Sequence, residues 1–290
     1  FLAASGVKSF WSERDFVAPA RKLSEWGYSD ADLLQAVAQS PMPKAPSVTV
    51  VQTMSMHTPF VVLQPEKYLQ QFESRMDALG LSQAQRDNYR KQKDIYASIL
   101  FTDEALRVFF DKVSARPEWK NTVWVITGDH RLPEIPMASR IERYHVPLIV
   151  YSPLLRTPLR IKALSSHFDI APSLLAMLSH RYGMSSPKRV HWMGTGLDVY
   201  PQWRNLHTLP IKQTKTELSD YVSGEYYLAQ DKLYSLQDGL VTEPEEAPEI
   251  AQSLRADFAS MRAALVRLSQ GAGLVAEAGR GAGDRPLELP

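Results

Sequence analysis

The sequence predicts an α/β protein in which helices pack on a sheet to form a layered sandwich. Two short runs, residues 122–127 (TVWVIT) and 146–151 (VPLIVY), are mainly apolar and show no polar alternation. Such runs are typical of strands in a sheet that is covered on both faces. Stretches with helical periodicity lie between and after the strand-like segments. The resulting order along the chain is strand, helix, strand, strand, helix.

The composition is that of a soluble globular protein. The chain has 290 residues, with 44% hydrophobic and 22% charged residues, which fits one large domain or one domain plus a small appendage. A net charge of +1 gives no electrostatic reason to expect a nucleic-acid partner. The absence of cysteine excludes disulfides, thiolate zinc sites and cysteine nucleophiles within these residues. No apolar run reaches the roughly 18 residues that a membrane span requires.

Local signals place the elements of the first half of the chain. Residues 1–47 form an N-terminal segment in which Ser29 or Asp30 caps a short helix that prolines end after residue 40. Residues 47–54 (SVTVVQTM) are β-branched and predict a buried strand, followed by a loop that contains His57. Apolar residues at helical spacing predict helices over 66–79 and 82–113.

The second half contains a capped helix, and the residue pattern changes after it. Residues 165–178 predict a helix with Asp169 as the N-cap and Pro172 in its first turn. After residue 205 we expect two short antiparallel strands and then an amphipathic helix over 247–268. We therefore divide the chain into a catalytic-type part (1–205), a completing or flanking part (206–270) and a tail (271–290) that is expected to be disordered because of its composition.

Asp129 and His130 are the strongest candidates for chemistry, since they directly follow a predicted buried strand. Ligands of open α/β sheets bind beyond the carboxyl ends of the strands. A carboxylate and an imidazole together suit a divalent cation such as Mn²⁺ or Zn²⁺. Gly128 is expected to let the backbone turn sharply, so that both side chains face one point. The alternative is that the pair is only a cap and a surface histidine.

Other polar residues carry weaker signals. His57 follows the first predicted strand but lies alone in its loop. For His145 and His167 structural roles are favoured, and no pattern surrounds the remaining histidines (His180, His191 and His207). The charged residues after the Asp–His pair either contact an anionic substrate or form a solvated loop (Arg131, Glu134, Arg140 and Arg143). The sequence has no phosphate-binding glycine loop and no G-x-S-x-G elbow.

Five segments, in order, resemble the alkaline phosphatase and sulfatase superfamily. Residues 122–130 look like its late metal-binding strand, 145–153 like the next strand, and 166–175 (SHFDIAPSLL) like the helix that closes the pattern. Residues 26–33 (WGYSDADL) and 56–60 (MHTPF) are similar to pieces of the lipoteichoic acid synthase type, the phosphoglycerol transferases. The spacing from Tyr96 to Asp103 also fits that subgroup. The resemblance implies a sulfatase-like three-layer sandwich with a small C-terminal extension of a hairpin and a helix.

The resemblance also implies a site and a reaction. Asp129 and His130 would bind one divalent metal, Mn²⁺ ahead of Zn²⁺ or Mg²⁺, and His57, with Arg131, would bind the substrate. A threonine nucleophile would take a phosphoglycerol-type or phosphoethanolamine-type group from a membrane phospholipid through a covalent phospho-threonine and pass it to a glycan or lipid acceptor. Such enzymes face the outside of the bacterial cytoplasmic membrane (the periplasm or cell surface) and are anchored there by N-terminal helices.

The chain departs from the family pattern at its beginning. In the family the early acidic ligand and the nucleophile precede the segment that resembles residues 26–33, and Ser5, Ser9 and Ser12 do not follow a buried strand. We therefore assign no nucleophile and expect a fragment rather than a degenerate relative, with the sandwich truncated at its N-terminus. Two other functions stay open: a sulfatase, and a non-catalytic relative that binds lipid or a partner. The sequence does not indicate the oligomeric state.

Overall fold

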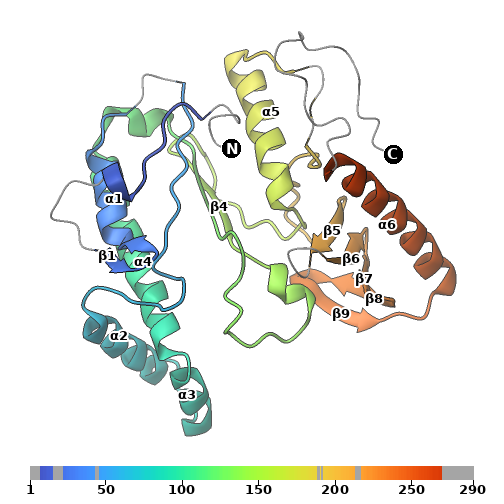
Figure 1. The fold of residues 1–290 in the computed structure, drawn as a ribbon, viewed down its shortest axis with the longest axis horizontal. Helices are drawn as coiled ribbons and strands as arrows, with labels where there is room; N and C mark the ends of the chain where they lie inside the picture. Colours follow the sequence, from blue (N-terminus) through green and yellow to red (C-terminus); the bar gives the residue numbers. More distant parts are fainter. Residues whose placement is uncertain are drawn as a thin grey trace. The chain divides into compact units, whose positions relative to one another are not determined.

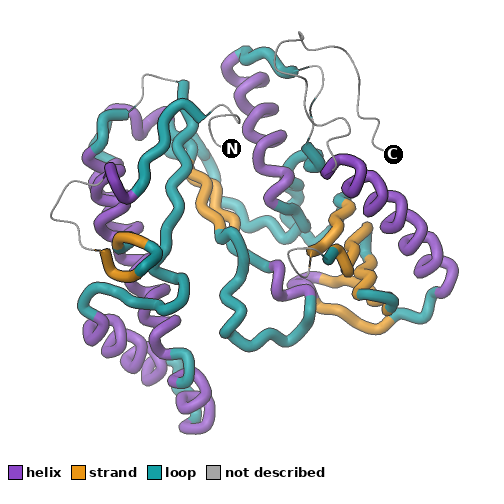
Figure 2. The backbone as a smooth tube through the Cα atoms, in the orientation of Figure 1, coloured by secondary structure: helices purple, strands orange, loops and turns teal. Residues whose placement is uncertain are grey.

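The computed structural model describes residues 7–15, 22–42, 46–187, 190, 192–212 and 217–269. The chain forms two compact units, drawn together in Figure 1 and coloured by secondary structure in Figure 2. Unit 1 consists of residues 1–136 and 146–156, and unit 2 of residues 137–145 and 157–290. Both units combine helices with sheets, as the predicted α/β class requires. Among the helices of the described residues, none is both long and apolar enough to cross a lipid bilayer.

Four helices form most of unit 1: α1 (Asp30–Gln39), α2 (Pro65–Ala78), α3 (Gln83–Arg90) and α4 (Lys93–Val113). Ser29 caps α1, because its hydroxyl accepts a hydrogen bond from the backbone N–H of Asp32 at 3.0 Å. Helices α1 and α4 bury Leu34, Ala105 and Phe109 between them. Helix α2 packs on α4 through Tyr68 and Phe101, whose rings meet edge to face.

The prediction of a single helix over 82–113 is wrong, because the helical conformation is interrupted between α3 and α4. Gln92 has φ −116° and ψ 26°, outside the helical region, and the two helices are separate on either side of it. The break lets α3 contact α2, where Arg90 forms an ion pair with Glu73 at 2.7 Å. Since that contact joins residues far apart in sequence, periodicity along one helix does not reveal it.

The sheet of unit 1 is small and is covered less completely than predicted. Strands β3 (Trp124–Thr127) and β4 (Leu148–Tyr151) pair antiparallel. Trp124 packs against Phe109 and Phe110 of α4, so one face of this pair meets the helices. All four residues of β4 are exposed, which contradicts the expectation of a sheet buried on both faces. A second, two-stranded hairpin pairs β1 (Lys22–Ser24) with β2 (Gly27–Tyr28).

The strand predicted over 47–54 is absent from the structure. These residues have no assigned strand, and the side chains of Val48 and Val50 are 85% and 88% exposed. Val51 alone of the three packs against the core between α1 and α4. A β-branched run therefore favours an extended backbone, but it becomes a strand only where a neighbouring strand supplies the hydrogen bonds.

Unit 2 contains a five-stranded antiparallel sheet where the sequence predicted two strands. Its order is β5 (Thr208–Lys212), β6 (Leu218–Ser223), β7 (Tyr226–Ala229), β8 (Lys232–Gln237) and β9 (Val241–Pro244). Pro210 lies in β5 and Pro244 in β9, the two edge strands. Proline is tolerated at a sheet edge because its missing N–H faces no partner there. Because a proline usually argues against a strand, neither edge strand is predicted from the sequence.

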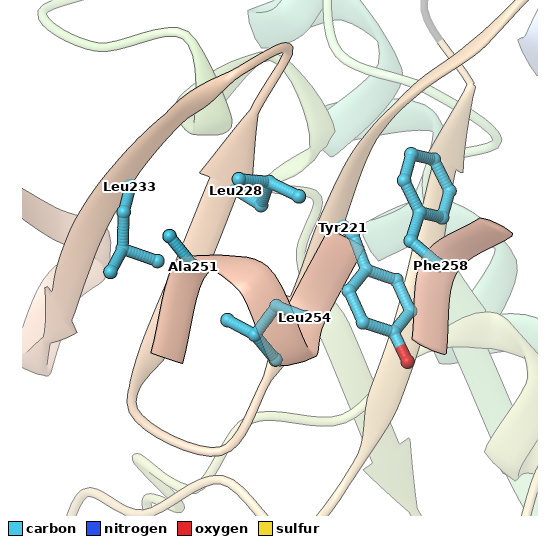
Figure 3. Packing of buried hydrophobic residues seen from close by; sticks show 6 residues of the cluster. All are labelled: Tyr221, Leu228, Leu233, Ala251, Leu254 and Phe258. Carbon is cyan, nitrogen blue, oxygen red and sulfur yellow. The ribbon is translucent and has the colours of Figure 1, made fainter. Parts of the chain in front are cut away.

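One face of this sheet is covered by helix α6 (Pro248–Ser269), close to the helix predicted over 247–268. Figure 3 shows Ala251, Leu254 and Phe258 of the helix packed on Leu228 and Tyr221 of the strands. The rings of Tyr221 and Phe258 stack with their centroids 5.0 Å apart. The predicted tail beyond residue 270 lies outside the described residues.

The other face of the sheet contains a buried ion pair. Asp220 is fully buried, and its carboxylate accepts two hydrogen bonds from the guanidinium of Arg140 at 2.7 and 2.9 Å. The hydroxyl of Tyr227 donates a third bond at 2.6 Å. Burial and the neighbouring Asp220 raise the pKa of Tyr227, so this hydroxyl keeps its proton.

The rest of unit 2 is helix α5 (Ile170–Tyr182) and short 3-10 turns. Asp169 occupies the N-cap position of α5 as predicted, but its side chain makes no capping bond to that helix. It instead completes the capping box of Ser166, the N-cap of the preceding 3-10 turn. The 3-10 helices of the two units are η1 (Glu13–Asp15), η2 (Pro117–Asn121), η3 (Ile141–Tyr144), η4 (His167–Asp169) and η5 (Asp238–Leu240).

Candidate functional site

Asp129 and His130 lie in the loop that follows β3, at the end of the strand as predicted. Both side chains are exposed, 78% for Asp129 and 63% for His130. The carboxylate Oδ2 of Asp129 is 3.8 Å from Nε2 of His130. The backbone N–H of His130 donates a hydrogen bond to Oδ1 of Asp129 at 2.9 Å, which holds the carboxylate beside the imidazole.

The imidazole of His130 is oriented by its own backbone. Nδ1 lies 2.9 Å from the carbonyl oxygen of Arg131. Because a carbonyl only accepts, Nδ1 must donate its proton, and Nε2 is the nitrogen left to bind a ligand. Histidines that bind metals commonly use their second nitrogen in this way, which fixes the tautomer and the ring orientation.

The pair fits one metal ion as part of a larger ligand set. Two ligand atoms that each lie about 2.0–2.2 Å from a metal are separated by roughly 3.0–3.5 Å. The 3.8 Å between Oδ2 and Nε2 is slightly longer, so a small rotation of two exposed side chains would bring both into range. Within the described residues, no group of three or more histidine, cysteine or acidic side chains could hold a metal. Among the described residues, at most two such side chains are therefore available to a metal at this place.

Gly128 does not have the function that we predicted for it. Its φ lies outside the left-handed region, so its backbone conformation does not require glycine. A Cβ added there would lie 3.4 Å from the carbonyl oxygen of His130 and from a methyl carbon of Val146, which is ordinary contact. The short hydrogen bonds within residues 129–131, rather than a glycine turn, bring the two side chains together.

His57 lies in the loop before α2 and is also exposed. Its Nδ1 is 2.8 Å from the carbonyl oxygen of Thr58, so again Nε2 is the nitrogen available to a ligand. The indole of Trp26 flanks the ring, with the centroids 4.6 Å apart and the planes tilted by 53°. His57 also lines a shallow hollow together with Ser24, Tyr28 and Met54.

One hydrogen bond joins the loop of His57 to the loop of the Asp–His pair. The hydroxyl of Thr58 donates to Oε1 of Glu134 at 3.2 Å. Since Thr58 follows His57 and Glu134 lies four residues after His130, the two predicted histidines belong to neighbouring segments of unit 1. This bond connects two loops whose predicted site residues, His57 and His130, are 73 residues apart in sequence.

The charged residues after the pair separate into two groups. Arg131 donates a hydrogen bond to the carbonyl oxygen of Pro136 at 3.2 Å and acts on Tyr96 of α4 through its charge. Burial raises the pKa of Tyr96, and the charge of Arg131 opposes part of that effect. Arg140, in contrast, is committed to Asp220 in unit 2. This ion pair gives Arg140 a structural role in unit 2.

Among the other histidines that the structure describes, His207 has a distinctive environment. It is 8% exposed, and its Nδ1 lies 3.2 Å from the hydroxyl of Thr195 and 3.5 Å from Oδ1 of Asp169. Its Nε2 is buried with no hydrogen-bond partner in the described chain. His167 belongs to η4, in line with a structural role, and His191 lies outside the described residues.

Two residues that the sequence marked only as a turn and a cap turn out to border His57. Trp26 contacts the imidazole ring, and Asp30 holds the backbone two residues before it, at Ser55. The sequence contains a signal for this contact: Ser29 already supplies the helix cap, so the carboxylate of Asp30, at the first helical position, is available for another bond.

Comparisons with known proteins show what the chain is similar to. The Sulfatase family model matches residues 1–180. A curated relative, the lipoteichoic acid synthase-like protein YvgJ of Bacillus subtilis (strain 168), is 21% identical over 261 residues. That alignment covers 83% of the chain but only 38% of the relative's length. No solved structure gives a significant match.

Proposed function

The chain belongs to the sulfatase family, and on this premise we propose that it serves in the metal-dependent transfer of a phosphoglycerol-type or phosphoethanolamine-type group. Enzymes of this family use a divalent metal to transfer or hydrolyse phosphate or sulfate esters. The donor in our proposal is a membrane phospholipid, and the acceptor is a glycan or another lipid. The similarity to a lipoteichoic acid synthase-like protein favours phosphate over sulfate as the transferred ester.

The observation that carries the proposal is the arrangement of Asp129 and His130. Oδ2 of Asp129 and Nε2 of His130 lie 3.8 Å apart, and the bond from Nδ1 to Arg131 keeps Nε2 available. A divalent metal bound there would supply positive charge next to the transferred group. Asp129 and His130 would hold it, with Mn²⁺ as the preferred ion and Zn²⁺ or Mg²⁺ as alternatives. None of the described residues is assigned as the nucleophile.

His57 and Arg131 would bind the substrate. With Nδ1 committed to the carbonyl of Thr58, Nε2 of a neutral His57 accepts a hydrogen bond from a hydroxyl, such as one on a glycerol head group. An imidazolium would instead donate to a phosphate oxygen. The guanidinium of Arg131 adds positive charge in the neighbouring loop, which suits an anionic ester.

A membrane lipid donor implies a place of action at a membrane. We propose that the chain acts on the outer side of the bacterial cytoplasmic membrane, in the cell envelope. The support is the similarity to the lipoteichoic acid synthase-like relative. The expected membrane anchor would lie outside these residues.

The first experiment measures metal content and ester transfer in the intact protein. We expect Asp129→Ala and His130→Ala to lose bound Mn²⁺, measured by elemental analysis after dialysis, and to lose turnover with it. His57→Gln should keep the metal and lose transfer rate. Asp111→Ala and His180→Ala are matched controls, because both residues are exposed and belong to helices rather than to this loop. Unchanged metal content and turnover in Asp129→Ala and His130→Ala would refute the assignment.

The choice of ester is tested with two substrates. A phosphatidylglycerol with a fluorescent acyl chain reports transfer through the release of fluorescent diacylglycerol, and p-nitrophenyl sulfate reports sulfatase activity. Diacylglycerol release that depends on Asp129 supports the proposal. Sulfate release alone would favour the sulfatase function, which the family match also permits. A protein that binds vesicles but turns over neither substrate would be a non-catalytic relative.

A further inference from the structure

Asp30 makes a set of contacts that its position in the sequence does not explain. It is the first residue of α1 and is fully buried. The helix does not need its side chain, because Ser29 caps the N-terminus by accepting from the N–H of Asp32. Burying a carboxylate is costly unless hydrogen bonds compensate for the lost water. The contacts of Asp30 show where that compensation comes from.

Its carboxylate joins two segments that are distant in sequence. Oδ1 accepts hydrogen bonds from the backbone N–H groups of Met54 and Ser55, at 2.7 and 2.9 Å. Oδ2 accepts from the hydroxyl of Thr102, in the middle of α4, at 2.7 Å. The backbone N–H of Asp30 donates in return to the hydroxyl of Ser55 at 3.1 Å. Asp30 therefore fixes the backbone of residues 54–55 to helices α1 and α4.

The fixed backbone is the start of the turn that carries His57. The N–H of His57 donates to the carbonyl oxygen of Met54 at 3.0 Å, and the N–H of Phe60 donates to the carbonyl of His57 at 2.8 Å. Phe60 has a φ of 58°, in the left-handed region that a non-glycine residue occupies only at a cost. A turn with this strain keeps its shape only when its ends are held, and Asp30 holds one end.

The segment just before α1 also contacts the imidazole ring of His57. Trp26 flanks His57 at 4.6 Å between ring centroids and lies four residues before Asp30. Asp30, at the start of α1, thus holds the backbone of the turn, and Trp26, between β1 and β2, contacts the ring of His57.

We propose that Asp30 is a positioning residue for His57, which it holds in place through Met54 and Ser55 for binding of the transferred ester. The proposal rests on the proposed function for its catalytic consequence, but its structural part concerns only the turn. Asp30 itself does not touch substrate. Its removal acts on the reaction through the place and tautomer of the His57 ring.

The test compares Asp30→Ala with a conservative variant and a matched control in the intact protein. Asp30→Asn keeps an acceptor for the amides of Met54 and Ser55, and its NH₂ group donates to the hydroxyl of Thr102. Asp32→Ala removes a carboxylate from the same turn of α1 that contacts Ser29 and not the His57 turn. We expect Asp30→Ala to lower kcat at least tenfold, since misplacing a binding group by about 1 Å costs on the order of 100-fold. Asp30→Asn should stay within about threefold of the parent protein.

A double-mutant cycle separates positioning from general stability. In a His57→Gln background, Asp30→Ala should cause no further loss of kcat, because the residue through which it acts is already gone. The same loss in both backgrounds would overturn the proposal. If Asp30→Ala does not fold, Thr102→Val takes its place, since it removes one of the three bonds to the carboxylate while keeping the shape of the side chain.

A nuclear magnetic resonance measurement tests the structural part without any turnover. The imidazole ¹⁵N signals of His57, assigned by their loss in His57→Gln, should show a proton fixed on Nδ1 in the parent protein, in Asp30→Asn and in Asp32→Ala. In Asp30→Ala, or in Thr102→Val to a smaller extent, they should shift towards the mixed tautomers of a solvated imidazole. Unchanged signals in a folded variant would refute the positioning role. Absent ester transfer in the parent protein would refute only the proposed function.

Discussion

The ion pair between Arg140 and Asp220 gives a stability prediction whose size follows from the structure. Arg140→Met removes the guanidinium while keeping an unbranched apolar side chain, and it leaves a carboxylate with no exposed surface. Removing one partner of a buried pair costs about 3–5 kcal/mol. The side chain of Arg140 is 38% exposed, and hydroxyls of Tyr227 and Ser219 still donate to Asp220. These features place the loss at the lower limit, about 3 kcal/mol, or roughly a 100-fold change in the unfolding equilibrium.

The assay is urea unfolding at neutral pH, followed by far-ultraviolet circular dichroism. Lys162→Met is the matched control in the same unit, because Lys162 pairs with Asp238 while both side chains are about half exposed (50% and 47%). Such surface pairs contribute about 0–1 kcal/mol, so the control should change little. A loss in Arg140→Met no larger than in Lys162→Met would refute the reasoning.

A second variant tests the physical cause of that loss. If the penalty arises from a buried charge without its partner, then neutralising the charge should relieve it. Asp220→Asn combined with Arg140→Met should therefore be more stable than the sum of the two single losses predicts. Strictly additive losses would show that the ionic interaction is not the source of the stabilisation.

Two further predictions concern unit 2. Gly194→Ala should destabilise the protein by about 3 kcal/mol or more, because the added Cβ would lie 1.9 Å from the backbone carbonyl oxygen of Phe168. The control Gly128→Ala, in unit 1, should cost less than about 1 kcal/mol, because its added Cβ has only ordinary contacts. Equal urea midpoints for the two variants would contradict this prediction. The guanidinium of Arg204 lowers the pKa of Asp198 below its usual value, so the stabilisation is present above about pH 4 and is lost as the pH falls through the lowered value. Asp198→Asn should therefore be less stable at pH 6, and its unfolding free energy should fall less steeply between about pH 5 and pH 2; parallel curves for the two proteins would exclude this effect.

The elements that the sequence predicts well are those with local signals. Ser29 caps α1 as one of the two predicted candidates, and α2 and α6 begin and end within one or two residues of their predicted bounds. A cap or an apolar stripe needs only neighbours within a few residues, so the chain itself contains the information. The strand segments 122–127 and 146–151 also contain the observed β3 and β4.

The predictions that failed depend on contacts between distant residues. The run 47–54 has the composition of a strand but lacks a hydrogen-bonded neighbour among the described residues. The break at Gln92 goes with a tertiary contact, the ion pair between Arg90 of α3 and Glu73 of α2. The edge strands β5 and β9 contain prolines that argue against a strand until their edge positions are known. In each case the deciding interaction is tertiary, and no local pattern encodes it.

The candidate site shows the same division between local identity and distant geometry. Residue type and order identify Asp129, His130 and His57, and the family match covers all three. The sequence does not indicate that the Nδ1–H group of each histidine donates to the carbonyl oxygen of the next residue, at 2.8 Å for His57 and 2.9 Å for His130. Because of this shared arrangement, both rings leave Nε2 available to a ligand, which in our proposal is a metal for His130 and a substrate for His57. A local bond to the backbone therefore determines which nitrogen of each ring is available, whereas contacts between distant residues hold the loops: Asp30 bonds the backbone before His57, and Thr58 bonds Glu134.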